Sequence, residues 1–288
     1  MQKIVLHLTI IVMLGISCQT TQDNDSKDSL NSAKGKLFII GGGKKPMEML
    51  QNLADISEAK ENGYTVILPM SSSKPHASGL SIMEDLEDVG VSDINIFNLQ
   101  SEEDMTSSKL DSIKNARLIY LTGGKQSQFM EIAKNTPLVE AVKEAYKNGA
   151  TIAGTSAGAA LMSKKMITGD ELKHPEYTGN FRTIEANNIV TEPGLGLLEN
   201  VIVDQHFIQR MRMNRLISAI LENPKDLGIG IDESTAILVD KNKATVYGIG
   251  QVVVIENTEK ESKAQDGLLG GKNLKMSIHL PNESFKIK

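Results

Sequence analysis

The sequence predicts an α/β protein built on a mostly parallel β-sheet, with antiparallel strands added near the C-terminus. From Lys36 onward, short apolar runs alternate with amphipathic stretches, a pattern typical of strands and helices that alternate around a parallel sheet. After Leu227 the sequence becomes rich in strand-like runs, which indicates antiparallel pairing. With 288 residues and 40% apolar content, the chain is long enough to bury one large core.

The individual elements follow from these runs. Six strands are predicted at residues 37–40, 65–68, 94–97, 118–121, 151–153 and 201–203. Helical spacing of apolar residues predicts two of the helices between them, with Leu50, Leu53 and Ile56 before Gly63, and Leu138, Val142 and Ala145 before Gly149. Antiparallel strands are predicted at residues 236–239 and 251–255, with an edge strand at 276–280.

The N-terminus has the pattern of a bacterial lipoprotein signal. Lys3 precedes an apolar stretch, residues 4–16, that is short for a membrane span and leads into Cys18, the only cysteine. In this interpretation a signal peptidase cuts before Cys18 and the thiol is lipidated. The alternative is an ordinary signal peptide or an N-terminal helix with an incidental cysteine.

This interpretation divides the chain into three parts. Residues 1–18 are the signal peptide, the polar residues 19–33 form a flexible tether, and residues 34–288 form a single catalytic domain. We therefore expect an exported cell-envelope lipoprotein, periplasmic or at the cell surface, that is held at the membrane only by its lipid anchor.

The composition restricts the partners. A net charge of −5, with basic and acidic residues interspersed, argues against a nucleic-acid binder. Only 4% of the residues are aromatic and none is Trp, which weakens a carbohydrate interpretation. A small or peptidic partner is favoured, and a homodimer is left open.

The strongest motif is Gly154-Thr155-Ser156-Ala157-Gly158, which lies between an apolar strand and a helix start rich in small residues. It has the form of a nucleophile elbow, in which flanking glycines allow a tight turn and the serine sits at a helix N-terminus. The alternative is that Ser156 is only a helix N-cap. We predict that Ser156 is a nucleophile.

A nucleophilic serine needs a base, and His206 is the best placed histidine. It follows a predicted strand closely, and the ends of parallel strands converge on the crevice where the elbow also opens. The other histidines lie in the signal, in polar loops or in the last strand: His7, His76, His174 and His279. His206 is therefore predicted as the general base, against the alternative of an ordinary structural histidine.

The third member of a triad is a carboxylate that holds the imidazole. Residues 228–234 offer Asp232 and Glu233 at the end of another short strand, where strand alternation places them on opposite faces. Glu233 is favoured, Asp232 is second, and Glu171 or Asp170 are less favoured. The remaining alternative is a solvated strand end without a catalytic role.

An oxyanion hole needs backbone donors. Residues 118–126 form a strand that runs into a glycine turn and then a helix, so the amides can approach a ligand closely. We expect the N–H groups of Gly124 and Ala157 to form the hole and Gln126 to reach the substrate. An ordinary strand-to-helix turn would have the same sequence. The earlier glycine run, residues 41–43, lacks the G-x-G-x-x-G spacing and is weak evidence for nucleotide binding.

Three arginines, Arg210, Arg212 and Arg215, follow His206 within nine residues of an acidic protein. Arg212 and Arg215 share a helical face and Arg210 does not, so we expect the helix to begin after Arg210 and all three side chains to point towards His206. Guanidinium groups suit carboxylates. The cluster therefore predicts an acidic substrate, against the alternative of a solvated helix face.

Four motifs together resemble those of the cyanophycinase family, which is related to the aspartyl dipeptidases. They are the Gly-Thr-Ser-Ala-Gly-Ala, Thr-Gly-Gly-Lys-Gln and Gly-Ile-Gly-Ile-Asp-Glu sequences, and Gly-Leu-Gly-Leu-Leu followed by Asp-Gln-His-Phe and its arginines. The resemblance covers the chain from Lys34 to the C-terminus. It implies a flavodoxin-like three-layer sandwich similar to class I glutamine amidotransferases, with a serine where those enzymes use a cysteine.

The resemblance also implies roles for individual residues. It implies Ser156 as nucleophile, His206 as base and Glu233 as its partner. The residues that it implies as lining the substrate pocket are Gln126, Asp204, Gln205, Arg210, Arg212 and Arg215. No metal and no cofactor are implied. The sequence departs from the family pattern at Lys125, where an acidic residue is expected, and in its export signal, which enzymes of intracellular storage granules do not need.

The expected function is that of a serine-type exopeptidase. The family cleaves cyanophycin, a poly-aspartate chain with arginine on each β-carboxyl, to β-aspartyl-arginine dipeptides, here through an acyl-enzyme. One alternative is an aspartyl or β-aspartyl dipeptidase, and another is a non-catalytic surface protein that binds acidic peptides. An amidotransferase is disfavoured because the only thiol belongs to Cys18.

Overall fold

The structure is a computed structural model that describes residues 33–176 and 181–287. Five parallel strands form one part of the central sheet: β1 (Lys36–Ile40), β2 (Thr65–Leu68), β3 (Ile94–Ile96), β4 (Leu118–Leu121) and β5 (Thr151–Thr155). Three antiparallel strands extend it: β10 (Thr235–Asp240), β11 (Lys243–Gly248) and β16 (Ser284–Lys286). The strand order is β16-β11-β10-β1-β5-β4-β2-β3, so the antiparallel strands continue the sheet beyond β1.

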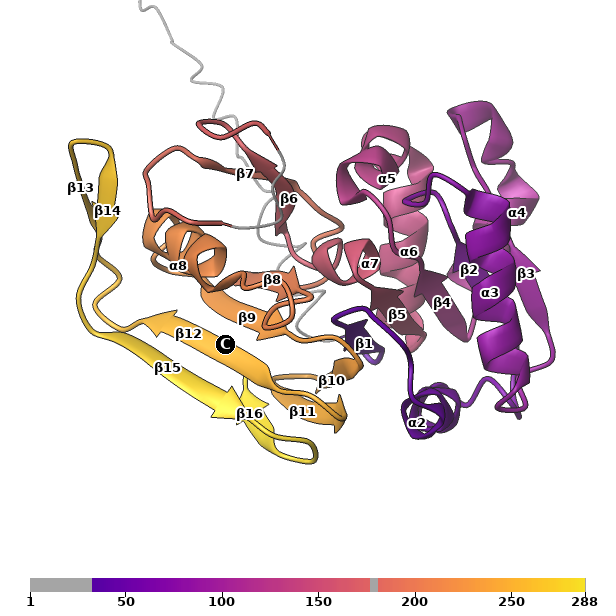
Figure 1. Cartoon of the computed structure of the whole chain (residues 1–288). Coiled ribbons are helices and arrows are strands. Elements are labelled where there is room, and N and C mark those ends of the chain that lie inside the picture. Colours follow the sequence, from indigo (N-terminus) through magenta and orange to yellow (C-terminus); the bar gives the residue numbers. More distant parts are fainter. Residues whose placement is uncertain (1–32, 177–180, 288) are drawn as a thin grey trace, which may run out of the picture.

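Helices cover both faces of this sheet (Figure 1). On one face lie α2 (Met47–Ser57) and α3 (Pro75–Glu87). On the other lie α4 (Ser107–Lys114), α5 (Gln126–Ala133), α6 (Pro137–Asn148) and α7 (Ala157–Ala160), and a short 3-10 helix spans Glu102–Asp104. Along β1, Leu37 packs into one layer and Phe38 into the other, which explains the continuous apolar run of a strand buried on both faces. The predicted three-layer α/β fold is confirmed.

A second, four-stranded sheet lies beside the first. Its strands are β8 (Val201–Gln205), β9 (Leu227–Ile231), β12 (Val252–Asn257) and β15 (Leu274–His279), in the order β15-β12-β9-β8. Helix α8 (Met213–Glu222) packs on one face, and the other face joins the core of the main sheet. The remaining described strands form two antiparallel hairpins. One pairs β6 (Lys165–Glu171) with β7 (Ile189–Pro193), and the other pairs β13 (Lys263–Gln265) with β14 (Leu268–Gly270).

This second sheet corrects one expectation. The end of β8 was expected at the crevice of the same parallel sheet as the elbow, but β8 pairs with β9 and lies outside that sheet. The sequence could not separate the two cases, because β8 is buried on both faces just as a strand of the main sheet is. Ile202 packs against α8, and Val203 lies in the core that the two sheets share. The carboxyl end of β8 still reaches the elbow, because the two sheets share one core.

All nine predicted strand runs are strands in the structure. Helix α6 ends at Asn148, before Gly149 in the left-handed conformation, as expected. Helix α2 ends earlier than expected, because Glu58 takes a left-handed conformation (φ 55°) directly after Ser57. Among the described residues no helix is long and apolar enough to cross a membrane. The predicted signal peptide with Cys18, and residues 19–32 of the tether, lie outside the described residues.

Candidate active site

Ser156 occupies a sharp turn between β5 and α7. Its backbone has φ 53° and ψ −108°, a strained conformation for a residue with a side chain. The turn is tied to β1 because the Ser156 N–H donates to the carbonyl of Ile40 at 3.0 Å. Only glycine fits on either side, since a Cβ at Gly154 would lie 2.4 Å from the Gly158 carbonyl oxygen and one at Gly158 would lie 2.3 Å from that of Leu121. This is the geometry of a nucleophile elbow.

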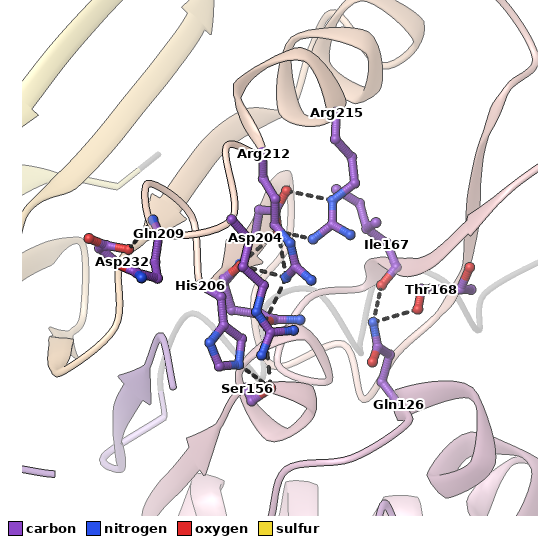
Figure 2. Close-up of polar contacts among 12 residues, drawn as sticks. Gln126, Ser156, Ile167, Thr168, Asp204, His206, Gln209, Arg212, Arg215 and Asp232 are labelled. Atoms are coloured by element: carbon purple, nitrogen blue, oxygen red, sulfur yellow. Dashed lines mark hydrogen bonds and ion pairs between the residues drawn. The ribbon is translucent and has the colours of Figure 1, made fainter. Parts of the chain in front are cut away.

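Three side chains line up across this turn. The Nε2 atom of His206 lies 2.9 Å from the Ser156 hydroxyl (Figure 2), and its Nδ1 atom lies 2.5 Å from a carboxylate oxygen of Glu233. His206 follows β8 directly and is buried, and its N–H donates to the Gly41 carbonyl at 2.7 Å. The order hydroxyl, imidazole and carboxylate is the order that a catalytic triad requires.

Two of the alternative candidates for the carboxylate of the triad, Asp232 and Glu171, form hydrogen bonds elsewhere. Asp232 accepts hydrogen bonds from the N–H groups of Ile208 at 3.1 Å and Gln209 at 2.9 Å, so it holds the loop after His206 (Figure 2). Glu171 accepts from the side chain of Asn188. Of the acidic residues that the sequence singled out for the triad, the structure therefore brings Glu233 to the imidazole.

The glycine run at the end of β1 supports the triad, and sequence reasoning missed this. A Cβ at Gly42 would lie 2.3 Å from Cε1 of His206, and one at Gly43 would lie 2.8 Å from Cβ of Glu233. The Gly42 carbonyl also accepts from the Ser234 N–H at 2.8 Å. The signal was present in the sequence, because the run follows a strand of the parallel sheet at the edge where the elbow opens.

We predict that Gly42→Ala reduces kcat by about 100-fold or more, because the added methyl group displaces the His206 ring from Ser156. Gly149→Ala is the matched control. Its φ of 115° is close to the 112° of Gly42, but its Cβ would meet only Lys34, at 3.8 Å. Steady-state kinetics of both folded variants test this prediction, and equal losses of activity would refute it.

Ser156 lies in a cleft of about 420 Å³. Its walls are formed by Gly124, Lys125, Gln126, Ser127, Ser156, Thr168, Gly169, Asp170, Gln205, Arg210, Arg212 and Arg215. In residues 33–176 and 181–287, no group of three or more His, Cys, Asp or Glu side chains is arranged to hold a metal ion. The cleft is lined by five of the six residues expected in the substrate pocket, and Asp204 is the one that is absent from its walls.

Gln126 lines the cleft as expected, whereas Asp204 does not. Asp204 is buried beneath the cleft, where it forms an ion pair with Arg215, and its side chain does not line the wall. Gln126 lines the cleft but is buried, and its amide nitrogen donates to the carbonyls of Ile167 at 2.6 Å and Thr168 at 2.8 Å (Figure 2). It therefore fastens α5 to β6.

The sequence predicts that all three arginine side chains point towards His206, and the structure does not bear this out. Arg210 is exposed and lies 3.9 Å from the Glu233 carboxylate. Arg212 is the residue before α8, and its guanidinium donates to the backbone and side-chain oxygens of Gln205 at 2.6 and 2.9 Å. The physical reason is that buried guanidinium groups need acceptors, and Gln205 and Asp204 are the nearest.

The predicted oxyanion donors are the backbone amides of Ala157, next to Ser156 in the chain, and Gly124, which lines the same cleft. Ala157 follows Ser156 in α7, and Gly124 is held against Ser71, where a Cβ would lie 1.9 Å from the carbonyl oxygen. Within the part of the chain that the structure describes, neither N–H donates a hydrogen bond. Both amides are thus available to an oxyanion, and their role stays a prediction.

The environment of His206 favours its neutral form. Burial lowers the pKa of the His206 imidazole below its usual value of 6.5, the hydrogen bond that the imidazole donates to Glu233 opposes this shift, and the charge of Arg210 adds to it. A base must be unprotonated to accept the hydroxyl proton, so kcat/KM should rise with pH through a midpoint below 6.5.

We predict that Arg210→Gln moves this acid limb of kcat/KM to higher pH. Removal of a nearby positive charge makes protonation of His206 easier and so raises its pKa. The control is Arg182→Gln, which removes an exposed arginine that does not contribute to the shift. A pH profile of kcat/KM provides the measurement, and an unchanged or lowered midpoint in Arg210→Gln would contradict the prediction.

A hydroxyl, an imidazole and a carboxylate in hydrogen-bonded order at a strand-to-helix elbow of an α/β sheet define a serine hydrolase. The family model of Peptidase family S51 matches residues 27–247. The chain belongs to this family and is a serine-type peptidase.

The chain is similar to two cyanophycinases and to a solved peptidase. It is 33% identical over 234 residues to the cyanophycinase of a Nostoc species, a match that covers 79% of this chain and 76% of the relative. It is 30% identical to the cyanophycinase of Geminocystis herdmanii, covering 77% and 81% of the two chains. A solved peptidase from an acI-B1 Actinobacterium shares the fold, with a TM-score of 0.63, 21% identity and coverage of 89% and 98%.

Proposed function

We propose that this peptidase cleaves cyanophycin to β-aspartyl-arginine dipeptides through an acyl-enzyme on Ser156. The observation that carries the proposal is the hydrogen-bonded chain of Ser156, His206 and Glu233 at the wall of a cleft that also presents cationic side chains. The cyanophycinase relatives support the same substrate class.

The proposed reaction is acyl transfer in two steps. Ser156 Oγ attacks the aspartyl carbonyl while His206 Nε2 accepts the hydroxyl proton, and Glu233 holds the imidazole through Nδ1–H. The N–H groups of Gly124 and Ala157 stabilise the oxyanion. His206 then gives the proton to the leaving amine. A water molecule, activated by the same imidazole, hydrolyses the ester and restores Ser156.

The charges of the cleft suit a carboxylate-rich chain. Arg210 is exposed near the triad, while Arg212 and Arg215 are fixed by Gln205 and Asp204. Fixed guanidinium groups have little conformational freedom to lose when they bind a carboxylate. The arrangement supports binding of a poly-aspartate backbone.

Incubation of the enzyme with cyanophycin and, separately, with α-linked aspartyl dipeptides tests the proposal, with products identified by mass spectrometry. Release of β-aspartyl-arginine from the polymer is the expected result. Cleavage of dipeptides alone would replace the proposal with an aspartyl dipeptidase, and binding without any cleavage would indicate a non-catalytic surface protein.

From the sequence, we further propose that the catalytic domain, residues 34–288, is exported and anchored through a lipidated Cys18. Acquisition of external polymer would explain export of such an enzyme. Fractionation of cells that express the protein and its Cys18→Ser variant tests this, since only the unmodified chain should remain with membranes. Equal distribution of the two would exclude the lipid anchor.

A further inference from the structure

Two charged side chains in the cleft are not engaged by the protein. Lys125 and Asp170 are both exposed and both line the wall that holds Ser156. Among the described residues, neither side chain forms an ion pair or a hydrogen bond, whereas Arg210 and Arg215 have carboxylate partners. Lys125 and Asp170 are therefore a cation and an anion of the cleft that other described side chains leave available to a ligand.

The fold holds these two charges on one wall. Lys125 is the residue before α5, and the next residue, Gln126, donates to the carbonyls of Ile167 and Thr168 in β6. Asp170 follows Thr168 by two residues in the same strand. The intervening Gly169 lies beside Arg215, since a Cβ there would be 3.8 Å from its Nη1 atom. The positions of Lys125 and Asp170 are thus coupled through Gln126.

A ligand that matches this wall carries a carboxylate and a cation on the same group. The arginine branch of a β-aspartyl-arginine unit has both, because its amino group is used in the amide and its α-carboxylate and guanidinium stay free. Asp170 is also the only carboxylate that lines the cleft among the described residues. A guanidinium forms its strongest hydrogen bonds with a carboxylate.

Resting on the proposed function, we propose that Asp170 determines specificity by binding the cationic side chain of the branch, while Lys125 binds its free α-carboxylate. This assignment explains how a lysine in the Thr-Gly-Gly-Lys-Gln turn is compatible with an arginine-bearing substrate. The cation is thereby recognised from β6 and the α-carboxylate from the turn before α5.

Citrulline provides the discriminating probe, because it has nearly the shape of arginine without the charge. Two short β-linked aspartyl peptides, one with arginine branches and one with citrulline branches, are titrated by calorimetry into the full-length protein with Ser156→Ala. We expect about tenfold tighter binding of the arginine peptide, the typical contribution of a charge-assisted hydrogen bond. When Asp170→Asn is added to this variant, the affinities for the arginine peptide and the citrulline peptide should differ by no more than about twofold.

Glu192→Gln is the matched control, because Glu192 is an exposed carboxylate of β7 in the same hairpin and lies outside this cleft. It should preserve the preference for arginine. Lys125→Gln should weaken both peptides by a similar factor of about three, because both carry the α-carboxylate. It should have no effect on peptides whose branch carboxylate is amidated.

A preference for arginine that survives Asp170→Asn, or no preference before that change, would overturn the assignment. Cleavage of the arginine peptide by protein with an intact Ser156 is measured separately. A failure to cleave contradicts the proposed function, while the binding ratio still decides the role of Asp170, so the two failures are distinguishable.

Discussion

Alanine in place of Ser156 is expected to reduce kcat for cyanophycin by about 10⁴-fold or more, because among the described cleft residues only the Ser156 hydroxyl is hydrogen-bonded to the imidazole of His206. The fold should be unaffected, since the Ser156 hydroxyl forms hydrogen bonds only with His206 and Gln205 among the described residues. Product release followed by mass spectrometry, together with circular dichroism, measures both effects.

Ser163→Ala is the control for this loss. Ser163 lies in the same segment, is buried, and accepts the Val203 N–H at 3.1 Å outside the cleft. Its replacement should lower stability by about 1 kcal/mol and leave kcat within a few-fold of the parent. A Ser156→Ala variant that keeps more than about one hundredth of the parental kcat would remove Ser156 from the role of nucleophile.

The second large effect concerns stability. Arg215→Met is expected to lower the free energy of unfolding by about 3–5 kcal/mol, because it leaves the carboxylate of Asp204 buried without its main partner. Both residues are 1% exposed, and the Arg215 guanidinium also lies 4.4 Å from the centre of the Phe181 ring. Urea unfolding followed by circular dichroism provides the measurement.

Two further variants serve as controls for the loss of stability in Arg215→Met. Lys164→Gln breaks the exposed ion pair with Glu199 and should cost less than about 1 kcal/mol. Asp204→Asn combined with Arg215→Met removes the buried charge as well as its partner and should recover much of the lost stability. If Arg215→Met costs no more than Lys164→Gln, the ion pair does not hold the wall of the cleft.

The strands of the fold could be predicted because each is a short apolar run with turn residues on both sides. The assignment of these strands to two different sheets could not be predicted, since β8 in the second sheet is as completely buried as β4 in the first. Burial on both faces produces the same sequence pattern wherever the strand lies. The early end of α2 was missed because a left-handed Glu58 is unusual for that residue type.

The triad residues could be selected from the sequence because chemistry restricts their types and the elbow restricts their places. The supporting residues were harder. Gly42 acts by the absence of a side chain next to His206, and Asp204 acts through Arg215, so neither carries a chemical signature of its own. Such roles depend on contacts between β1, β8 and α8, which are far apart in the sequence.

The acyl-enzyme is the central claim, and its direct observation is the most decisive measurement. The protein is quenched with acid during turnover of cyanophycin and digested, and the peptide that contains Ser156 is analysed by fragmentation mass spectrometry. We expect Ser156 to carry an ester to the backbone carbonyl carbon of an aspartyl residue whose β-carboxyl bears arginine, and no such adduct in the Ser156→Ala variant. An adduct on another residue, or undiminished turnover by that variant, would contradict the mechanism.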